Sequence, residues 1–141
     1  GLFLMVLSAC GNRRDGQEAE ENGTIIKQMI VEVNGQQFEA ELYDNATAAA
    51  LENILPMTLS MEEMNGNEKY YFMDGSLPSD AEDIGTIRSG DIMLYGSDCL
   101  VAFFKTFETS YSYTRIGHIE DAEGFAAALE RGTVEISFYM E

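Results

Sequence analysis

The sequence contains no tryptophan and few basic groups. Its 141 residues include eight lysines and arginines in total and one histidine, against 25 aspartates and glutamates, so the formal net charge is −17. Nucleic-acid binding normally needs a basic face that neutralises phosphates, so this balance argues against a nucleic-acid partner. The same charge argues against direct adhesion of the folded part to anionic lipid.

Cysteine and histidine are also scarce. The chain has two cysteines, Cys10 and Cys99, and a single histidine, His118. This is too few for an ordinary zinc site, and we expect no bound metal and no cofactor. Cys99 is expected to be a small buried apolar group, since free cysteine is among the most buried residue types, and a reactive thiol is the alternative. His118 falls in an expected strand, where a structural role is favoured over a catalytic one.

The apolar run at residues 1–7 (GLFLMVL) is far shorter than the ~20 residues needed to cross a bilayer. Small residues follow it, which is typical of an export signal and its cleavage site. The tetrapeptide Leu7-Ser8-Ala9-Cys10 resembles the bacterial lipobox, whose cysteine is acylated. We therefore expect a lipoprotein signal peptide at 1–9 and a lipid on Cys10 that anchors the chain at the cell envelope, outside the cytoplasm. An ordinary secretion signal is the alternative.

The next segment is polar throughout. Residues 11–23 (GNRRDGQEAEENG) contain no apolar side chain larger than Ala19. Such a segment cannot bury enough apolar surface to fold. We expect residues 10–23 to be the lipidated cysteine and a flexible tether, followed by a single folded domain at 24–141.

Alternation of apolar and polar residues predicts eight strands in this domain. The first two (29–33 and 38–42) flank Asn34-Gly35, a pair that favours a two-residue hairpin turn, and Asn65-Gly66 is a second such signal. Further strands are expected at 57–61, 68–73, 91–95, 99–105, 114–119 and 134–140.

Two helices are expected between the strands. Asp44 or Asn45 can cap the first, which should end before Pro56, since proline disfavours helical geometry in the preceding residue. The second is expected over Asp121–Arg131, with Gly132 as its stop. So many strand edges are usually hidden by a sandwich or by closure into a barrel.

Two segments are expected to be loops, at 74–90 and 106–113. The first contains acids that could bind calcium through hard oxygen ligands, although their spacing does not match the EF-hand, and a solvated loop is the favoured interpretation. These acids are Asp74, Asp80, Glu82 and Asp83.

The second half of the chain resembles the cyclophilin-like proteins of bacteria. The similarity lies in Gly90-Asp91 before a strand, Phe103-Phe104 in the next strand, and Thr114–Ile119 (TRIGHI) before a helix and a last strand. The stretches Tyr95–Asp98 (YGSD) and Thr109–Arg115 (TSYSYTR) resemble that group most. The resemblance covers residues 24–141. It implies a mainly β fold: a closed eight-stranded barrel with two capping helices.

The resemblance does not carry prolyl isomerase residues onto this chain. Isomerising cyclophilins use an arginine beside the twisted prolyl peptide and a tryptophan in the proline pocket. The corresponding region, Met57–Met73, has no arginine, and the chain has no tryptophan. Tyr113 stands where the pocket histidine aligns. Phe103 or Phe104 could still form part of an apolar wall.

A polar-aromatic cluster is the candidate binding site. Aromatic-lined concavities with a few polar groups are typical ligand sites, and tyrosine offers rigid contact area with a hydroxyl. The alternative is that these side chains are barrel core and strand surface, with Arg115 paired to a neighbouring acid. The candidates are Tyr70, Tyr95, Phe103, Tyr111, Tyr113 and Arg115.

Three functions fit the sequence. The first is a cell-envelope module without catalytic activity that binds a peptide or small molecule. The second is a peptidyl-prolyl isomerase or peptide chaperone, which rests on fold resemblance alone. The third is an enzyme of another class that uses Arg115, Tyr113 and an acid such as Glu68.

Overall fold

The structure is a computed structural model that describes residues 27–141. The expected signal peptide (1–9), Cys10 and the tether (10–23) lie outside the described residues, as do the first three residues of the expected domain (24–141). Within residues 27–141, neither helix has the length and apolar composition needed to cross a membrane.

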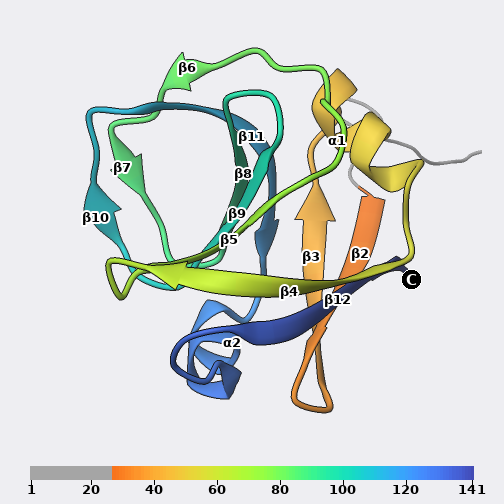
Figure 1. Cartoon of the computed structure of the whole chain (residues 1–141), viewed down its shortest axis with the longest axis vertical. Coiled ribbons are helices and arrows are strands. Elements are labelled where there is room, and N and C mark those ends of the chain that lie inside the picture. The colour runs from red at the N-terminus through yellow and green to blue at the C-terminus, as the bar shows by residue number, and fades with distance from the viewer. Residues whose placement is uncertain (1–26) are drawn as a thin grey trace, which may run out of the picture.

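Antiparallel strands form a closed barrel (Figure 1). Its wall runs in the order β3-β2-β12-β4-β5-β9-β8-β11, and β11 pairs with β3 to complete the circle. These eight strands confirm the predicted mainly β barrel. Their bounds are β2 (Lys27–Val33), β3 (Gln36–Leu42), β4 (Met57–Met64), β5 (Glu68–Phe72), β8 (Asp91–Tyr95), β9 (Cys99–Phe103), β11 (Ser112–Ile119) and β12 (Val134–Met140).

The alternation in the sequence arises because one face of each strand lines the barrel interior. Met29 lies opposite Ala40, and Val31 lies opposite Phe38, across the β2–β3 hairpin. All four side chains are buried in one apolar core that fills the barrel. Each large apolar side chain buried in this way contributes about 1.5–3 kcal/mol.

Both Asn-Gly pairs form the turns that the sequence predicts. Asn34 has φ 53° and Gly35 φ 79°, and Asn65 has φ 57° and Gly66 φ 67°. Such turns need positive φ at both central residues, which asparagine and glycine tolerate best. Two residues separate the paired Val33 and Gln36, whereas three separate the paired Met64 and Glu68.

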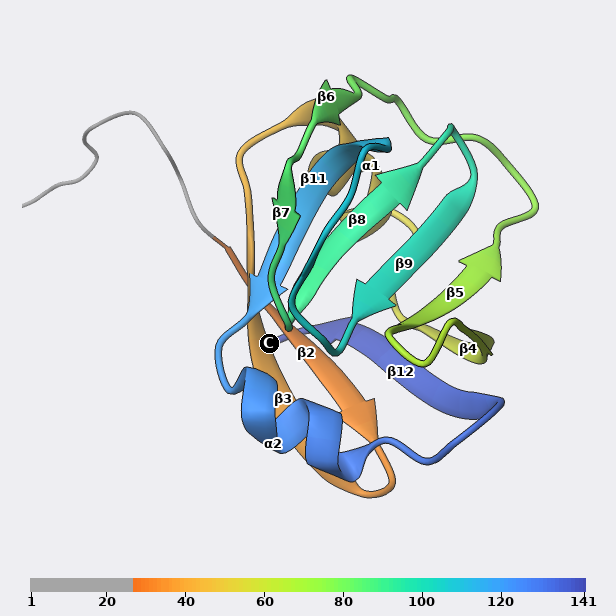
Figure 2. The same ribbon diagram turned by 90° about the vertical axis from the view of Figure 1, so that its left-hand side faces the viewer.

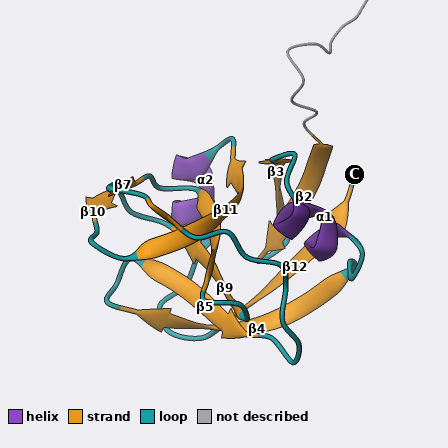
Figure 3. Cartoon of the chain, turned by 90° about the horizontal axis from the view of Figure 1, so that it is seen from above, coloured by secondary structure: helices purple, strands orange, loops and turns teal. Residues whose placement is uncertain are grey.

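Two short helices contribute side chains to the core, and strands make up most of the described chain (Figure 3). Helix α1 (Ala46–Glu52) begins at Asn45, whose side chain accepts a 2.8 Å hydrogen bond from the Ala48 amide. Its Leu51 is fully buried. The helix ends four residues before Pro56 rather than beside it.

Helix α2 (Ala122–Ala128) lies at the opposite end of the barrel from α1 (Figure 2). Asp121 caps it by accepting a hydrogen bond from the Gly124 amide. The expectation that it extends to Arg131 and stops at Gly132 is wrong, because Leu129 is already extended, with φ −75° and ψ 142°. Phe125 anchors the helix in the core, and its ring lies 5.9 Å edge-on from that of Phe38.

The two expected loops contain short strands. The segment 74–90 includes β6 (Glu82–Asp83) and β7 (Thr86–Ile87), and the segment 106–113 includes β10 (Phe107–Glu108) and the start of β11. Strands β7 and β10 pair with each other, and β6 pairs with β11. Two-residue strands give too little alternation for a sequence pattern to reveal. They lie along one side of the outer barrel wall at β8 and β11 (Figure 2).

Candidate functional site

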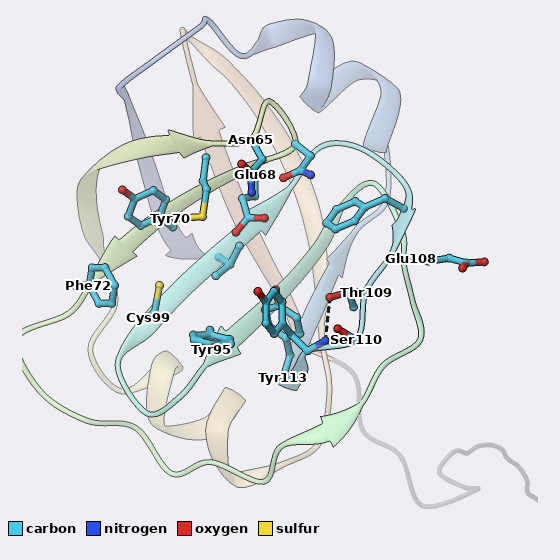
Figure 4. A pocket seen from close by; sticks show the side chains of 15 residues that line it. Asn65, Glu68, Tyr70, Phe72, Tyr95, Cys99, Glu108, Thr109, Ser110 and Tyr113 are labelled. Atoms are coloured by element: carbon cyan, nitrogen blue, oxygen red, sulfur yellow. Dashed lines mark hydrogen bonds between the residues drawn. The ribbon is translucent and has the colours of Figure 1, made fainter.

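A cavity of about 440 Å³ opens on the outer face of the barrel (Figure 4). Strands β5, β9, β8 and β11 form its floor, and the segment around β10 forms one side. Because successive residues of a strand point to opposite faces, the residues of β5 and β9 that line it recur at every second position. The lining residues are Met64, Asn65, Asn67, Glu68, Tyr70, Phe72, Tyr95, Cys99, Val101, Phe107, Glu108, Thr109, Ser110, Tyr111 and Tyr113.

Aromatic rings form one continuous side of the cavity. The ring of Tyr95 lies 5.4 Å from that of Tyr113 and 6.0 Å from that of Tyr111. Phe103 lies 5.6 Å from Tyr113 and 5.8 Å from Phe107. These spacings are typical of favourable edge-on and tilted aromatic pairs, which hold the rings in place.

A second aromatic pair stands on the other side. The rings of Tyr70 and Phe72 lie 5.9 Å apart, nearly perpendicular to each other. The Tyr70 hydroxyl donates a 3.2 Å hydrogen bond to Glu62, and this bond raises the pKa of Tyr70 above its ordinary value. Two rigid aromatic walls therefore flank the floor formed by β9.

The rim of the cavity is apolar and exposed. Among residues 27–141, five large apolar side chains are exposed, and four of them line this cavity. Their exposed fractions are 43% for Met64, 62% for Phe72, 45% for Tyr95 and 61% for Tyr111. Large exposed apolar patches are typical of interaction surfaces, so this rim is the candidate for one.

Glu68 is a largely buried acid among the residues that line the cavity. Its residue is only 9% exposed, and burial raises the pKa of its carboxyl above 4.5. Burial of Tyr113, and after it the negative charge of Glu68, raises the pKa of Tyr113 to about 12. Glu68 therefore contributes to the electrostatic environment of Tyr113 in the cavity.

Cys99 lies on the same floor and is a free, buried thiol. Burial, together with the charges of Asp98 and Glu68, raises the pKa of Cys99 to about 11. The thiolate is the nucleophilic form of cysteine, so this thiol is nearly all protonated at neutral pH. The prediction that Cys99 is a buried apolar group is confirmed.

The structure brings together most of the predicted binding residues. Tyr70, Tyr95, Tyr111 and Tyr113 line the cavity, and Phe103 is fully buried beneath it against Tyr113. That these residues bind a ligand stays a prediction.

Arg115 is not among the lining residues. Its Nε lies 3.6 Å from a carboxylate oxygen of Glu82, in agreement with the alternative that it pairs with a neighbouring acid. The other acids of segment 74–90 are also dispersed, and Asp83 accepts a hydrogen bond from Ser112. Within residues 27–141, no group of three or more acidic, histidine or cysteine side chains is arranged to hold a metal ion.

His118 lies in β11, as predicted, and contacts buried Asp91. Its Nδ1 is 2.8 Å from Asp91 Oδ1, and the other oxygen of that carboxylate accepts a bond from the Arg88 amide. Arg88 also places its guanidinium 3.3 Å from Asp91. This network holds the turn before β8 against β11, away from the residues that line the cavity.

Several residues that line the cavity were not predicted from the sequence. Phe72 and Phe107 extend the aromatic walls, and Thr109 Oγ1 accepts a bond from the Tyr111 amide that shapes the neighbouring loop. The signal for Phe72 was its outward register two residues after Tyr70, since residues i and i+2 of a strand share a face. Phe107 carried no such signal, because its strand has only two residues.

A family model described as the cyclophilin-like family matches residues 31–139. The chain is similar to the solution structure of the hypothetical protein AF2241 from Archaeoglobus fulgidus, with a TM-score of 0.59 and 18% sequence identity, over 85% of this chain and 98% of that chain. At this identity the likeness shows the fold alone. No curated protein matches the chain.

Proposed function

Because this chain belongs to the cyclophilin-like family, we propose that its barrel is a binding module for a peptide or small-molecule ligand, held at the cell envelope by a lipid on Cys10. The ligand lies in the cavity on the outer face of β5, β9 and β8. The proposal takes its support from the site and not from the fold, since one fold can carry many functions.

The placement of exposed apolar side chains carries this proposal. Four of the five large apolar side chains exposed in residues 27–141 gather around a single cavity. The volume of about 440 Å³ falls within the range of roughly 300–1,000 Å³ that ligand pockets occupy. A ligand that covers this rim would remove its apolar surface from water. Each Å² of apolar surface buried in this way stabilises the complex by about 25 cal/mol.

A thermal-shift screen with short peptides and small molecules tests the proposal. We expect binders to raise the unfolding temperature by several degrees, since a ligand at one hundred times its Kd stabilises a protein by about 2.7 kcal/mol. A variant with both Phe72→Ser and Tyr111→Ser should lose at least about half of that shift, because both removed rings are exposed at the cavity rim.

Ile54→Ser is the matched control. Ile54 is the fifth exposed large apolar side chain, 46% exposed, and it does not line this cavity. Its removal should leave the ligand-induced shift unchanged. A screen without any shift, or an equal loss in the control variant, would contradict the proposal.

A peptidyl-prolyl isomerase or chaperone is the alternative that the family resemblance favours. An isomerase lowers the rotation barrier of ~18–20 kcal/mol about the prolyl bond. Among residues 27–141, no arginine lines the cavity. A proline-peptide isomerisation assay separates the two functions, and acceleration above the uncatalysed rate would establish the alternative.

The lipid anchor rests on Leu7-Ser8-Ala9-Cys10 alone. In a bacterial host we expect the chain to incorporate a clickable fatty-acid analogue and to sediment with membranes. Cys10→Ser should remove both properties, because thioether-linked and amide-linked acyl chains together provide stable anchoring. Labelling that persists in this variant would contradict an anchor on Cys10.

A further inference from the structure

The carboxylate of Glu68 lies in apolar surroundings. Its register partners are Met64 in β4 and Phe103 in β9. The residue is more than nine-tenths buried, and no hydrogen bond or ion pair to Glu68 is formed by any other residue in 27–141. Figure 4 shows the carboxylate turned into the cavity, between Asn65 and Cys99. The Glu68 oxygens are open to the cavity and not sealed in the core. A largely buried carboxylate without a protein partner keeps little of its hydration, which points to a partner supplied from outside.

The rest of the cavity favours a cation over an anion. Among residues 27–141, no lysine, arginine or histidine lines it. Glu108, the other acid at its edge, extends away from the cavity (Figure 4). The rings of Tyr95 and Tyr113 lie 5.4 Å apart on the aromatic side of the cavity, and aromatic rings attract cations within about 6 Å of their centroids. The formal net charge of −17 adds a long-range attraction for cations.

We propose that the cavity takes an amine or guanidine group carried on an apolar stem, with its positive charge against Glu68. The inference rests on the proposed binding function and names the chemical class of the ligand. The stem lies along the apolar floor beside Phe107 and Val101, and the cation replaces the water that the carboxylate has lost. A bare metal ion does not fit, since one carboxylate offers too few ligands and no cluster of three such groups occurs within residues 27–141.

Matched peptides test the charge requirement. The full chain, labelled with ¹⁵N, is titrated with acetyl-Ala-Phe-X-Phe-Ala-amide in which X is lysine, arginine or the isosteric neutral norleucine. Benzyltrimethylammonium serves as a free small cation. We expect the lysine and arginine peptides to bind at least about ten times more tightly than the norleucine peptide, because a close pair of opposite charges adds to the binding free energy. Amide shifts should centre on Glu68 and Tyr113.

Two variants assign this preference to one carboxylate. In Glu68→Gln the affinities for the lysine and norleucine peptides should differ by less than about twofold. Glu135→Gln removes the same charge from an exposed position on β12, outside the cavity, and should keep the preference. Glutamine matches the size of glutamate, so the cavity shape is retained.

The outcomes distinguish a failure of this inference from a failure of the proposed binding function. Equal binding of the lysine and norleucine peptides would overturn the inference and leave the binding function in place. A preference that survives Glu68→Gln would also overturn it. Failure of every peptide and of the small cation, here and in the thermal-shift screen, would remove the binding function as well. Binding of benzyltrimethylammonium as tight as that of the lysine peptide would support the inference with a free organic cation as the ligand.

Discussion

Replacing Lys69 with methionine should lower the free energy of unfolding by about 3 kcal/mol, because it removes a buried ammonium and leaves the three groups that it contacts without their donor. Lys69 lies in β5, points to the barrel interior and is 0% exposed. Its ammonium donates to Glu63 at 2.9 Å, to the Glu130 carbonyl at 2.7 Å and to the Gly132 carbonyl. All three donors of the lysine are therefore used.

These bonds attach the connection between α2 and β12 to the sheet. The Gly132 amide donates to the same oxygen of Glu63 that Lys69 contacts, at 3.1 Å. With methionine at position 69, the carbonyls of Glu130 and Gly132 lose their ammonium donor, and Glu63 loses its counter-charge. Urea unfolding should show the change as a lower midpoint with an unchanged slope.

The effect should depend on pH in a defined direction. The hydrogen bond from Lys69 holds the pKa of Glu63 below 4.5, followed by the bond from the Gly132 amide. A carboxyl whose pKa is lowered by folding stabilises the protein above its unfolded pKa, and this contribution is lost as the pH falls through the folded pKa. The difference in the free energy of unfolding between the parent chain and Lys69→Met should therefore reach its full size above pH 4.5 and decrease below it.

Lys27→Met is the matched control. Lys27 forms a 3.2 Å ion pair with Glu52, but its side chain is 56% exposed. Exposed pairs contribute about 0–1 kcal/mol, so this variant should unfold close to the parent midpoint. Equal and small losses in both variants would show that the buried ammonium does not hold the α2–β12 connection.

The barrel could be predicted because its local signals agree with one another. Asn34-Gly35 fixes the β2–β3 register, and the alternating apolar residues on either side then fall on the same face. A slip by one residue would turn that face outward, so the pattern specifies the register strongly. Likewise, a cap at Asp44 or Asn45 could be expected from their short side chains, and Asn45 is the residue that caps α1.

Features that depend on contacts between residues far apart in the sequence could not be predicted in this way. Lys69 looks like a polar strand residue, and only the carbonyls of Glu130 and Gly132, some sixty positions later, make its burial favourable. The early end of α2 at Ala128 also has a tertiary cause, since Asn34 donates a 2.7 Å hydrogen bond to the Ala128 carbonyl. That bond satisfies a carbonyl which another helical turn would otherwise engage.

The candidate site could be predicted in part for a related reason. Tyrosines on outward positions of β5, β8 and β11 converge once the strands are neighbours in the barrel. Arg115 shares the outward face of β11 with Tyr113, but it reaches Glu82 of β6 instead. The burial of Glu68 could not be foreseen, because it depends on Met64 and Phe103 in two other strands.

Adding a single methyl group at Gly117 should destabilise the barrel by about 3 kcal/mol, the upper end of the usual cost of overpacking. Gly117 lies in β11 where the wall closes, opposite Leu42 of β3 and Ile92 of β8. A Cβ built there would lie 2.3 Å from the Glu41 carbonyl oxygen and 3.2 Å from its carbon. These are backbone atoms of a paired strand, so no side-chain rotation can relieve the overlap.

Gly117→Ala should therefore first weaken the pairing of β3 with β11, which closes the barrel. Amide hydrogen exchange should speed up at Tyr43 and Glu120, whose amides donate to Ile116 and Glu39 across this seam at 3.0 and 2.9 Å. Gly75→Ala is the control, since a Cβ at Gly75 meets no atom within 4 Å and its stability should change by less than about 0.5 kcal/mol. A parent-like midpoint and unchanged exchange in Gly117→Ala would mean that β3 and β11 can separate freely. Such a result would contradict the closed wall on which the outward direction of Tyr113, and with it one side of the cavity, depends.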